Sequence, residues 1–321
     1  MILRLLRGCL PAAVRLAMLW GAFLPLHAQT NPGADAGAQP IAFISDTQTP
    51  LFLESLVFGN DRNAEATDSL FADILRVRPS CLFMLGDLVS LGPYPRAWES
   101  MDTALARLHA AHVPVHALLG NHEVMYLPRT GERLFQENFP DHVRTGYACV
   151  VDSVGVVLLN SNFDILSEAE RQTQNRWYGQ MLDSLEHDAA VRAVVVCCHH
   201  APFSNSTVVG SSGAARAAFV PPFLAHAKCR LFLSGHAHTF EHFRESGKDF
   251  VVIGGGGGSR HRVFEGADQE WPDISPKIKP FFHFITLEKT PEGLRLRVRQ
   301  LRDDFSSMED GYSAIIAWKI E

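Results

Sequence analysis

The chain is poor in positive charge. Its 29 lysine and arginine residues face 35 aspartate and glutamate residues, which gives a formal net charge of −6. Residues 1–28 contain three of the arginines and no acidic residue, so the remainder has 26 basic and 35 acidic residues, a net charge of −9. Nucleic acids and anionic membrane surfaces are bound through clustered lysine and arginine. We therefore expect neither of them as a partner.

The chain also lacks a hydrophobic run of the roughly 20 residues that a membrane-spanning helix needs. The apolar run at residues 16–26 follows three arginines and ends two residues before Ala28. A basic start, an apolar centre and a small residue at the end are typical of a secretory signal peptide. We predict a signal peptide over residues 1–28, a periplasmic or secreted protein, and no membrane span after cleavage. An uncleaved N-terminal anchor is the alternative, because Leu26 fits poorly at position −3 of the cleavage site.

Cysteine is scarce as well, with six residues in 321, and their spacing forms no disulfide framework. Cys81, Cys197 and Cys198 lie in apolar runs, where a free cysteine behaves as a small buried hydrophobic residue. We expect no essential disulfide, although an exported protein could form one. A pair between Cys149 and Cys229 is left open by the sequence.

The chain has no internal repeat, and no polar low-complexity stretch interrupts it after residue 40. Residues 29–40 are small residues with proline and glycine and no apolar period, which predicts a flexible leader. With 46% hydrophobic residues, the chain can form a single large core. We therefore interpret residues 41–321 as one domain.

A repeated pattern is present instead: a short apolar run ends directly at a polar residue able to bind metal. Five such runs are present. Residues 41–45 lead to Asp46, 81–86 to Asp87, 113–120 to Asn121 and His122, 194–198 to His199, and 231–235 to His236 and His238. Such runs predict strands that are covered on both faces. Helical periodicity at 67–77, 94–111 and 167–187 alternates with them, and the tail is rich in β-type sequence, which indicates a layered α/β architecture.

Polar residues at the carboxyl ends of neighbouring strands converge on one crevice of an open α/β sheet. Carboxylate, amide oxygen and imidazole together suit divalent or trivalent ions such as Mn, Fe, Zn or Co. Two ions about 4 Å apart need a shared carboxylate, and an aspartate at a central strand end is the natural bridge. Such a pair of ions would hold a phosphate group and its attacking water.

The ordered motifs carry a family resemblance. Four motifs occur in order along the chain: Gly86-Asp87, Gly120-Asn121-His122-Glu123, His199 and Gly235-His236-Ala237-His238. Together they resemble, over about residues 41–260, the signature of calcineurin-like metallophosphoesterases. The resemblance implies a four-layer α/β/β/α sandwich of two mixed β-sheets flanked by helices, with the metal site at the C-terminal ends of the strands. It also implies roles for individual residues: Asp46 and His238 at the first metal, Asp87 as the bridge, Asn121, His199 and His236 at the second metal, and His122 near the leaving oxygen as general acid or electrostatic stabiliser. Gln48 is a further candidate ligand of the first metal, and the alternative is a hydrogen-bond donor beside the ligands.

The sequence departs from the family pattern at three places. The first motif is usually Asp-x-His, but here Gln48 replaces the histidine. A glutamine oxygen is a weaker and harder donor than imidazole, which should loosen the first metal or favour Mn or Fe over Zn. Residues 88–91 lack the Asp and Arg of the protein-phosphatase branch. Ser90 stands where purple acid phosphatases carry a metal-bound tyrosine.

These features predict a metal-dependent hydrolase that acts on a small phosphorylated substrate, either a mono- or a diester. One alternative is a degenerate member that binds metal or phosphorylated ligands without catalysis, for which Gln48 is the main support. A nucleotidase is the alternative among enzymes, although only some 60 residues follow Arg260, too few for a separate nucleoside-binding domain. We expect residues 254–258 to form a tight loop close to the metal site. Residues 260–262 could meet a second anionic group of the substrate or form solvated surface.

Overall fold

The computed structural model describes residues 39–59, 61–275 and 281–319. The predicted signal peptide and all but the last two residues of the predicted leader lie outside this range. Among the described residues, no helix is both long and apolar enough to cross a membrane.

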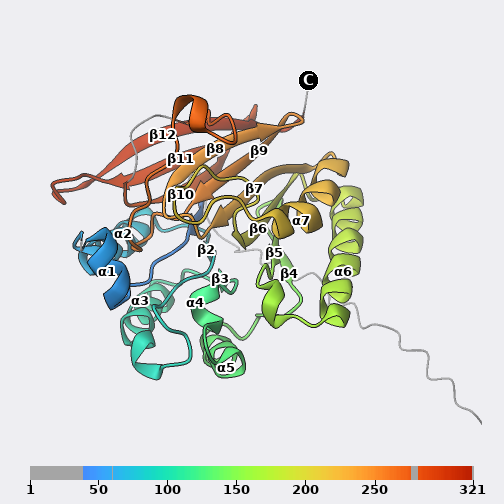
Figure 1. Cartoon of the computed structure of the whole chain (residues 1–321). Helices are drawn as coiled ribbons and strands as arrows, with labels where there is room; N and C mark the ends of the chain where they lie inside the picture. Colours follow the sequence, from blue (N-terminus) through green and yellow to red (C-terminus); the bar gives the residue numbers. More distant parts are fainter. Residues whose placement is uncertain (1–38, 60, 276–280, 320–321) are drawn as a thin grey trace, which may run out of the picture.

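The described residues form two six-stranded sheets (Figure 1). The first sheet has the order β12-β11-β10-β1-β2-β3, with bounds β1 Ile41–Ile44, β2 Cys81–Met84, β3 Val115–Ala117, β10 His283–Lys289, β11 Gly293–Leu301 and β12 Met308–Ala317. The second has the order β4-β5-β6-β7-β9-β8, with bounds β4 Tyr147–Val151, β5 Val154–Leu159, β6 Ala193–His200, β7 Cys229–Gly235, β8 Phe240–Glu245 and β9 Lys248–Ile253. Both sheets combine parallel and antiparallel neighbours, so they are mixed, as predicted.

Helices cover the outer face of each sheet. α2 (Asn63–Val77), α3 (Glu99–Ala110) and α5 (Pro128–Asn138) pack on the first sheet, whereas α6 (Glu168–His187) and α7 (Gly213–Ala225) pack on the second. Two shorter helices, α1 (Phe52–Phe58) and α4 (Asn121–Val124), follow β1 and β3. The α/β/β/α sandwich is therefore confirmed.

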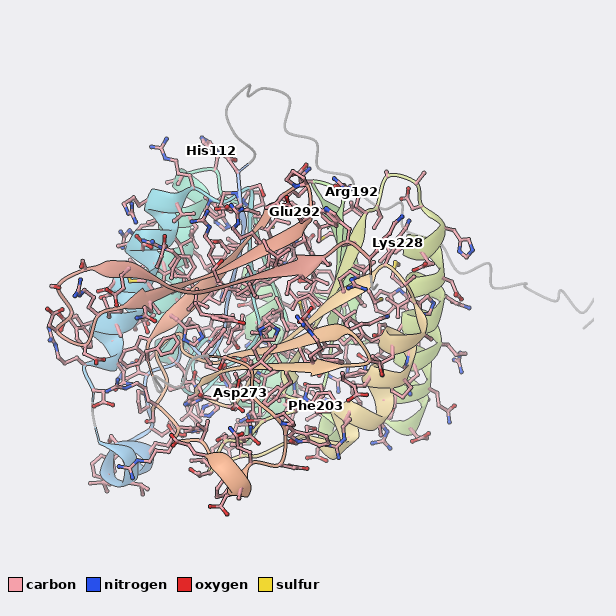
Figure 2. All side chains as sticks on the ribbon, turned by 90° about the horizontal axis from the view of Figure 1, so that it is seen from above. His112, Arg192, Phe203, Lys228, Asp273 and Glu292 are labelled. Carbon is pink, nitrogen blue, oxygen red and sulfur yellow. The ribbon has the colours of Figure 1, made fainter. Side chains whose placement is uncertain are left out.

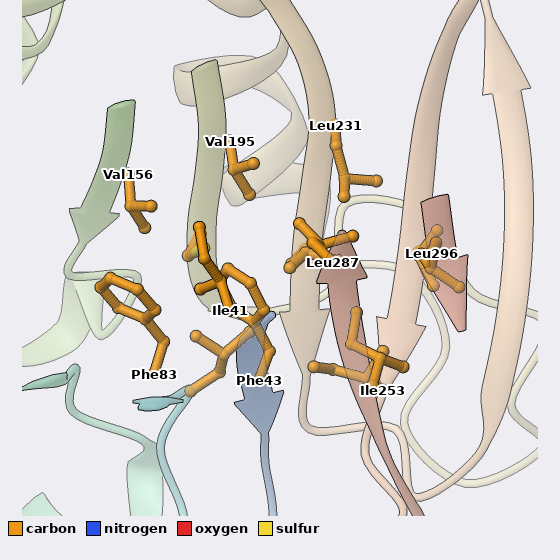
Figure 3. Close-up of a cluster of buried hydrophobic side chains, with 14 of the residues drawn as sticks. Ile41, Phe43, Phe83, Val156, Val195, Leu231, Ile253, Leu287 and Leu296 are labelled. Carbon is orange, nitrogen blue, oxygen red and sulfur yellow. The ribbon is translucent and has the colours of Figure 1, made fainter. Parts of the chain in front are cut away.

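The central core lies between the two sheets. Phe43 and Phe83 of the first sheet stack with ring centroids 5.1 Å apart and belong to the same buried cluster as Val195 and Leu231 of the second (Figure 3). These strands are apolar on both faces because one face meets the other sheet and the other face meets helices. Burial on both sides explains the unbroken apolar runs of the sequence.

Local sequence also accounts for several element boundaries. β4 and β5 form a hairpin whose turn residues Asp152 and Ser153 have φ of 49° and 67°, values that suit a two-residue hairpin turn. α6 begins at a capping box in which Ser167 Oγ accepts from the Glu170 N–H.

All five described cysteines are free thiols. Cys149 packs against the cluster between the two sheets, whereas Cys229 belongs to the cluster beneath α6 and α7. Because the two thiols contribute to different faces of the second sheet, the pairing left open by the sequence does not form.

Candidate metal centre

The loops after the central strands bring the predicted ligands together at one edge of both sheets. β1 leads to Asp46, β2 to Asp87 and β7 to His236, and these three residues have positive φ values of 60°, 51° and 66°. Non-glycine residues adopt this conformation only where the surrounding structure imposes it.

One group of donors consists of Asp46, Asp87 and His238. Their ligand atoms lie within 4.8 Å of one another, and His238 Nε2 is 3.4 Å from Asp46 Oδ1. Asp46 is fixed in place because both its carboxylate oxygens accept from the His236 N–H at 3.0 Å.

A second group consists of Asp87, His199 and His236, again with ligand atoms within 4.8 Å. His199 Nε2 lies 3.1 Å from Asp87 Oδ2 and 3.2 Å from Asn121 Oδ1, so the amide oxygen of Asn121 joins this group. Asp87 belongs to both groups. This is the shared carboxylate that two neighbouring metal ions require.

The protonation of the histidines suits metal ligation. His199 Nδ1 lies 2.9 Å from the Leu85 carbonyl, and His238 Nδ1 lies 2.7 Å from the Ser259 carbonyl. A carbonyl only accepts hydrogen bonds, so Nδ1 carries a proton in each ring and Nε2 is the ring nitrogen that faces the site.

Electrostatics keeps the shared carboxylate ionised. Burial alone would raise the pKa of Asp87, but the charges of His199 and His122 outweigh it and lower this pKa below its ordinary value. Asp87 in turn raises the pKa of His199 to about 9, against the effect of burial. Binding of a metal at His199 therefore displaces a proton. The donor set as a whole, two carboxylates with amide and imidazole, fits two ions of the Mn, Fe, Zn or Co kind.

Gln48 is buried beside the first group. With its amide oxygen 3.2 Å from His238 Nε2, its nitrogen donates to the Asp87 carbonyl at 2.8 Å and to the Asp46 carbonyl at 3.2 Å. The opposite orientation would leave the oxygen facing only acceptors. The oxygen thus points to where the ligand atoms of Asp46 and His238 meet.

His122 begins the short helix α4 together with Asn121, and its side chain is buried. Its backbone N–H donates to Asp87 Oδ1 at 2.8 Å, and its Nδ1 donates to the Ser90 carbonyl at 2.7 Å. Nε2 is thereby turned to the site, 3.9 Å from Asp87 Oδ2 and 3.9 Å from Glu54 Oε1. Burial opposes protonation, but the charge of Asp87 and the Ser90 carbonyl raise the pKa of His122.

The glycine loop at 254–258 lies against the site, as expected from the sequence. A Cβ on Gly258 would stand 2.5 Å from His238 Cε1, so only glycine allows the backbone to pass this close. The residues after the loop are engaged within the protein: Arg260 pairs with Asp61, and the His261 ring stacks on His238 at 4.3 Å. Of residues 260–262, only Arg262 is exposed, so it alone remains a candidate to contact a second anionic group of the substrate.

Sequence analysis missed two contributors. At the end of β5, Ser161 Oγ lies 2.8 Å from His200 Nδ1, which fixes a ring whose centroid is 4.5 Å from that of His236. At the start of α1, Glu54 faces His122. An Asn-Ser-Asn run after a buried strand was a readable signal for the first, whereas nothing in the sequence pointed to the second.

The chain matches a known protein family over more than half of its length. The family model of calcineurin-like phosphoesterases matches residues 39–240, more than half of the chain. The chain belongs to this family. The predicted resemblance is thus confirmed. β8 to β12 lie at or beyond the end of the matched segment.

Purple acid phosphatase 1 of Ipomoea batatas is similar to this calcineurin-like phosphoesterase, with 25% identity over 235 residues, 62% of this chain and 47% of the relative. The chain therefore spans about half the length of this curated relative. Ser90 of this chain meets the site through its backbone carbonyl, which accepts from His122 Nδ1.

Solved structures share the fold at low identity. A purple acid phosphatase from yellow lupin (Lupinus luteus) seeds superposes with a TM-score of 0.65 and 17% identity over 86% of this chain and 53% of its own. GAP50, described as the anchor in the inner membrane complex of Plasmodium, gives 0.62 at 13% identity over 87% and 88% of the two chains. A dimetal phosphatase from Danio rerio gives 0.53 at 17% identity over 88% and 100%.

Proposed function

We propose that this calcineurin-like phosphoesterase hydrolyses small phosphate esters with the help of two metal ions. The observation that carries the proposal is that Asp87 is shared by two separate donor groups while its carboxylate stands 3.9 Å from the Nε2 of His122. Metal sites that serve only structure are closed by their ligands, and they have no need of a directed imidazole beside them.

Individual residues would have separate roles in binding the metal ions and in donating a proton. Asp46, Gln48, Asp87 and His238 would hold the first ion, and Asp87, Asn121, His199 and His236 the second. When bound, the ions would neutralise the phosphate oxygens and lower the pKa of the attacking water. His122, whose Nδ1 is held by the Ser90 carbonyl, presents Nε2 to the leaving oxygen and donates a proton to it. We also propose that the two ions are Mn, Fe, Zn or Co.

The test is hydrolysis of p-nitrophenyl phosphate and bis-p-nitrophenyl phosphate by the purified protein. The protein is stripped of metal and then supplied with Mn, Fe, Zn, Co or Mg. We expect turnover that depends on metal and falls by several orders of magnitude in Asp87→Asn and His122→Ala, while both variants keep the fold. The better substrate distinguishes a monoesterase from a diesterase. Full turnover in both variants contradicts the assignment.

A non-catalytic metal or phosphate binder is the second candidate, supported by Gln48 in place of the usual histidine. The similarity to GAP50 shows that the fold also occurs in a protein described as an anchor. A folded protein that holds one ion or none in a metal titration, and hydrolyses neither ester, would favour this candidate.

We further propose export to the periplasm or the medium, with residues 1–28 removed and residues 41–321 forming one catalytic unit. The basic and apolar start of the chain supports the first part. The second is supported by β10 to β12, which extend the first sheet from β1 through β10 although they lie beyond the matched segment. N-terminal sequencing of the protein from cell fractions should give a chain that begins at Gln29. A cytoplasmic chain that keeps Met1 would contradict export.

A further inference from the structure

Glu54 is a carboxylate at the reaction centre that lies outside the family's motifs. It belongs to α1, which follows the Asp46 loop, and its Oε2 accepts from the Leu51 N–H at 2.7 Å. Its other oxygen, Oε1, is 3.9 Å from His122 Nε2. The side chain is 28% exposed, so it stands at the mouth of the site and is accessible to a substrate.

Among the described residues, no lysine or arginine neutralises the negative charge of Glu54. Within the described part of the chain, its only ion-pair partner is His122, and no lysine or arginine pairs with it. The other carboxylate at this distance from His122 is Asp87, which faces the two donor groups. Glu54 is thus the acidic group that a substrate meets on the His122 side.

This position defines which part of a substrate Glu54 can contact. In the proposed reaction the leaving oxygen accepts a hydrogen bond from His122 Nε2 at about 3 Å, which keeps it within about 7 Å of Glu54 Oε1. Two or three bonds further along, the leaving alcohol can reach the carboxylate. The phosphate, by contrast, belongs to the side of Asp87 and the histidine ligands.

We propose that Glu54 is a specificity-determining residue that selects esters whose leaving alcohol carries a positive charge, such as alkylammonium alcohols. The inference rests on the proposed function and adds a substrate class to it. A partly exposed carboxylate at this distance increases the affinity for a cation by about tenfold, after screening by water and salt. The same charge repels leaving groups with further phosphates, so nucleoside di- and triphosphates are disfavoured.

A matched pair of ligands tests the proposal. Phosphocholine has a neutral carbon isostere in which a tert-butyl group replaces the trimethylammonium group. The phosphonate analogues of both, in which a methylene group replaces the bridging oxygen, cannot be hydrolysed. Calorimetric binding of the two phosphonates to the full chain loaded with Mn²⁺ therefore measures charge selectivity without turnover. Hydrolysis of the two phosphate esters is measured in parallel.

The matched variants are Glu54→Gln and Glu292→Gln. Glutamine at position 54 removes the charge and can still accept from the Leu51 N–H. Glu292 is an exposed carboxylate in the turn between β10 and β11 (Figure 2). That turn lies beyond Leu287, which pairs with Ile41, so it is at the opposite end of the sheet from Asp46.

We expect the wild-type protein and Glu292→Gln to bind the cationic phosphonate about tenfold more tightly than the neutral one, and Glu54→Gln to bind both equally. Equal binding by the wild type, or a preference that survives in Glu54→Gln, would overturn the inference. Selective binding without hydrolysis of either ester would contradict the proposed catalysis and leave the charge selection standing. Hydrolysis of both esters, together with equal binding of the two phosphonates, would support the proposed catalysis and contradict the charge selection.

Discussion

The carboxylate of Glu123 accepts a hydrogen bond from the backbone N–H of Asp87 at 2.8 Å. It also accepts from the N–H groups of Leu88 at 2.7 Å and Gly120 at 2.8 Å. Glu123 is fully buried. One side chain therefore fastens the loop after β2 to the loop after β3, and so sets where the shared ligand stands relative to Asn121.

Replacing Glu123 with glutamine should weaken both the fold and the metal site. The amide can keep part of these contacts, but its NH₂ group would face backbone N–H donors and leave them unsatisfied. We expect a loss of about 2 kcal/mol in the free energy of unfolding, measured with urea on metal-free protein. A metal titration should show a 10- to 100-fold drop in affinity, roughly the effect of removing a partner that orients a ligand. Glu292→Gln, the exposed control, should change neither quantity, and unaltered metal affinity in Glu123→Gln would refute this positioning role.

The ligands could be predicted from the sequence because their signal is local. Asp87 follows an apolar run that can only be a buried strand, and the same holds for His199 and His236. The parallel pairing of the central strands then places these ends at one edge. The hydrophobic pattern therefore predicts where these side chains lie, and the family resemblance adds their roles.

What could not be predicted depends on contacts between distant segments. Glu54 meets His122 across 68 positions of sequence, through a short helix whose apolar residues Phe52 and Val57 are mostly exposed. Such a helix has no buried stripe that would reveal its orientation. β12 could not be predicted for a related reason. It is an edge strand with one side facing solvent, and its polar residues interrupt the apolar pattern by which a buried strand is recognised.

Gly120→Ala should disrupt the metal centre through space rather than backbone conformation. A Cβ at this position would stand 2.2 Å from Asp87 Oδ1 and 2.3 Å from the Asp87 backbone nitrogen, so the shared ligand must move. Because a displacement of about 1 Å at a reaction centre can reduce turnover about a hundredfold, we expect a loss of this order in metal-dependent hydrolysis.

Gly179→Ala is the matched control for that substitution. Gly179 lies within α6, and a Cβ there would have no atom within 4 Å. Alanine favours a helix over glycine by about 1 kcal/mol, so this variant should gain stability in urea and keep full activity. Wild-type turnover in Gly120→Ala would show that the Asp87 loop tolerates movement.

Acid should destabilise the protein through His142. Its ring is buried and packs edge-on against Phe135, and among the described residues its Nδ1 has no hydrogen-bond partner. Burial lowers the pKa of His142 to about 4, below the ordinary value of 6.5. Between pH 6.5 and pH 4 the imidazole is therefore protonated in the unfolded chain but neutral in the folded protein. Stability is therefore complete above pH 6.5 and falls as the pH drops to about 4, by on the order of 3 kcal/mol from this residue.

The measurement for His142 is the difference between the free energies of unfolding at pH 7.5 and pH 4.5, in urea and without metal. In His142→Phe, which replaces a neutral buried ring with an apolar one, this difference should be smaller than in the wild type by most of that amount. Other buried histidines titrate in both proteins and cancel. An identical difference in the two proteins would mean that His142 is protonated in the folded state.

Gln48→His should convert the first metal group to the usual donor set of the family. In the native protein the amide oxygen of Gln48 points to His238 Nε2, while its nitrogen is held by the Asp87 carbonyl. Imidazole is a softer and stronger donor, so we expect Zn²⁺ to bind the variant more tightly by on the order of tenfold, with a smaller change for Mn²⁺. Competition titrations with a chromogenic chelator measure both affinities. Gln48→Ala provides the opposite control: if it binds both ions as well as the wild type, Gln48 is not a ligand and only orients the Asp87 loop.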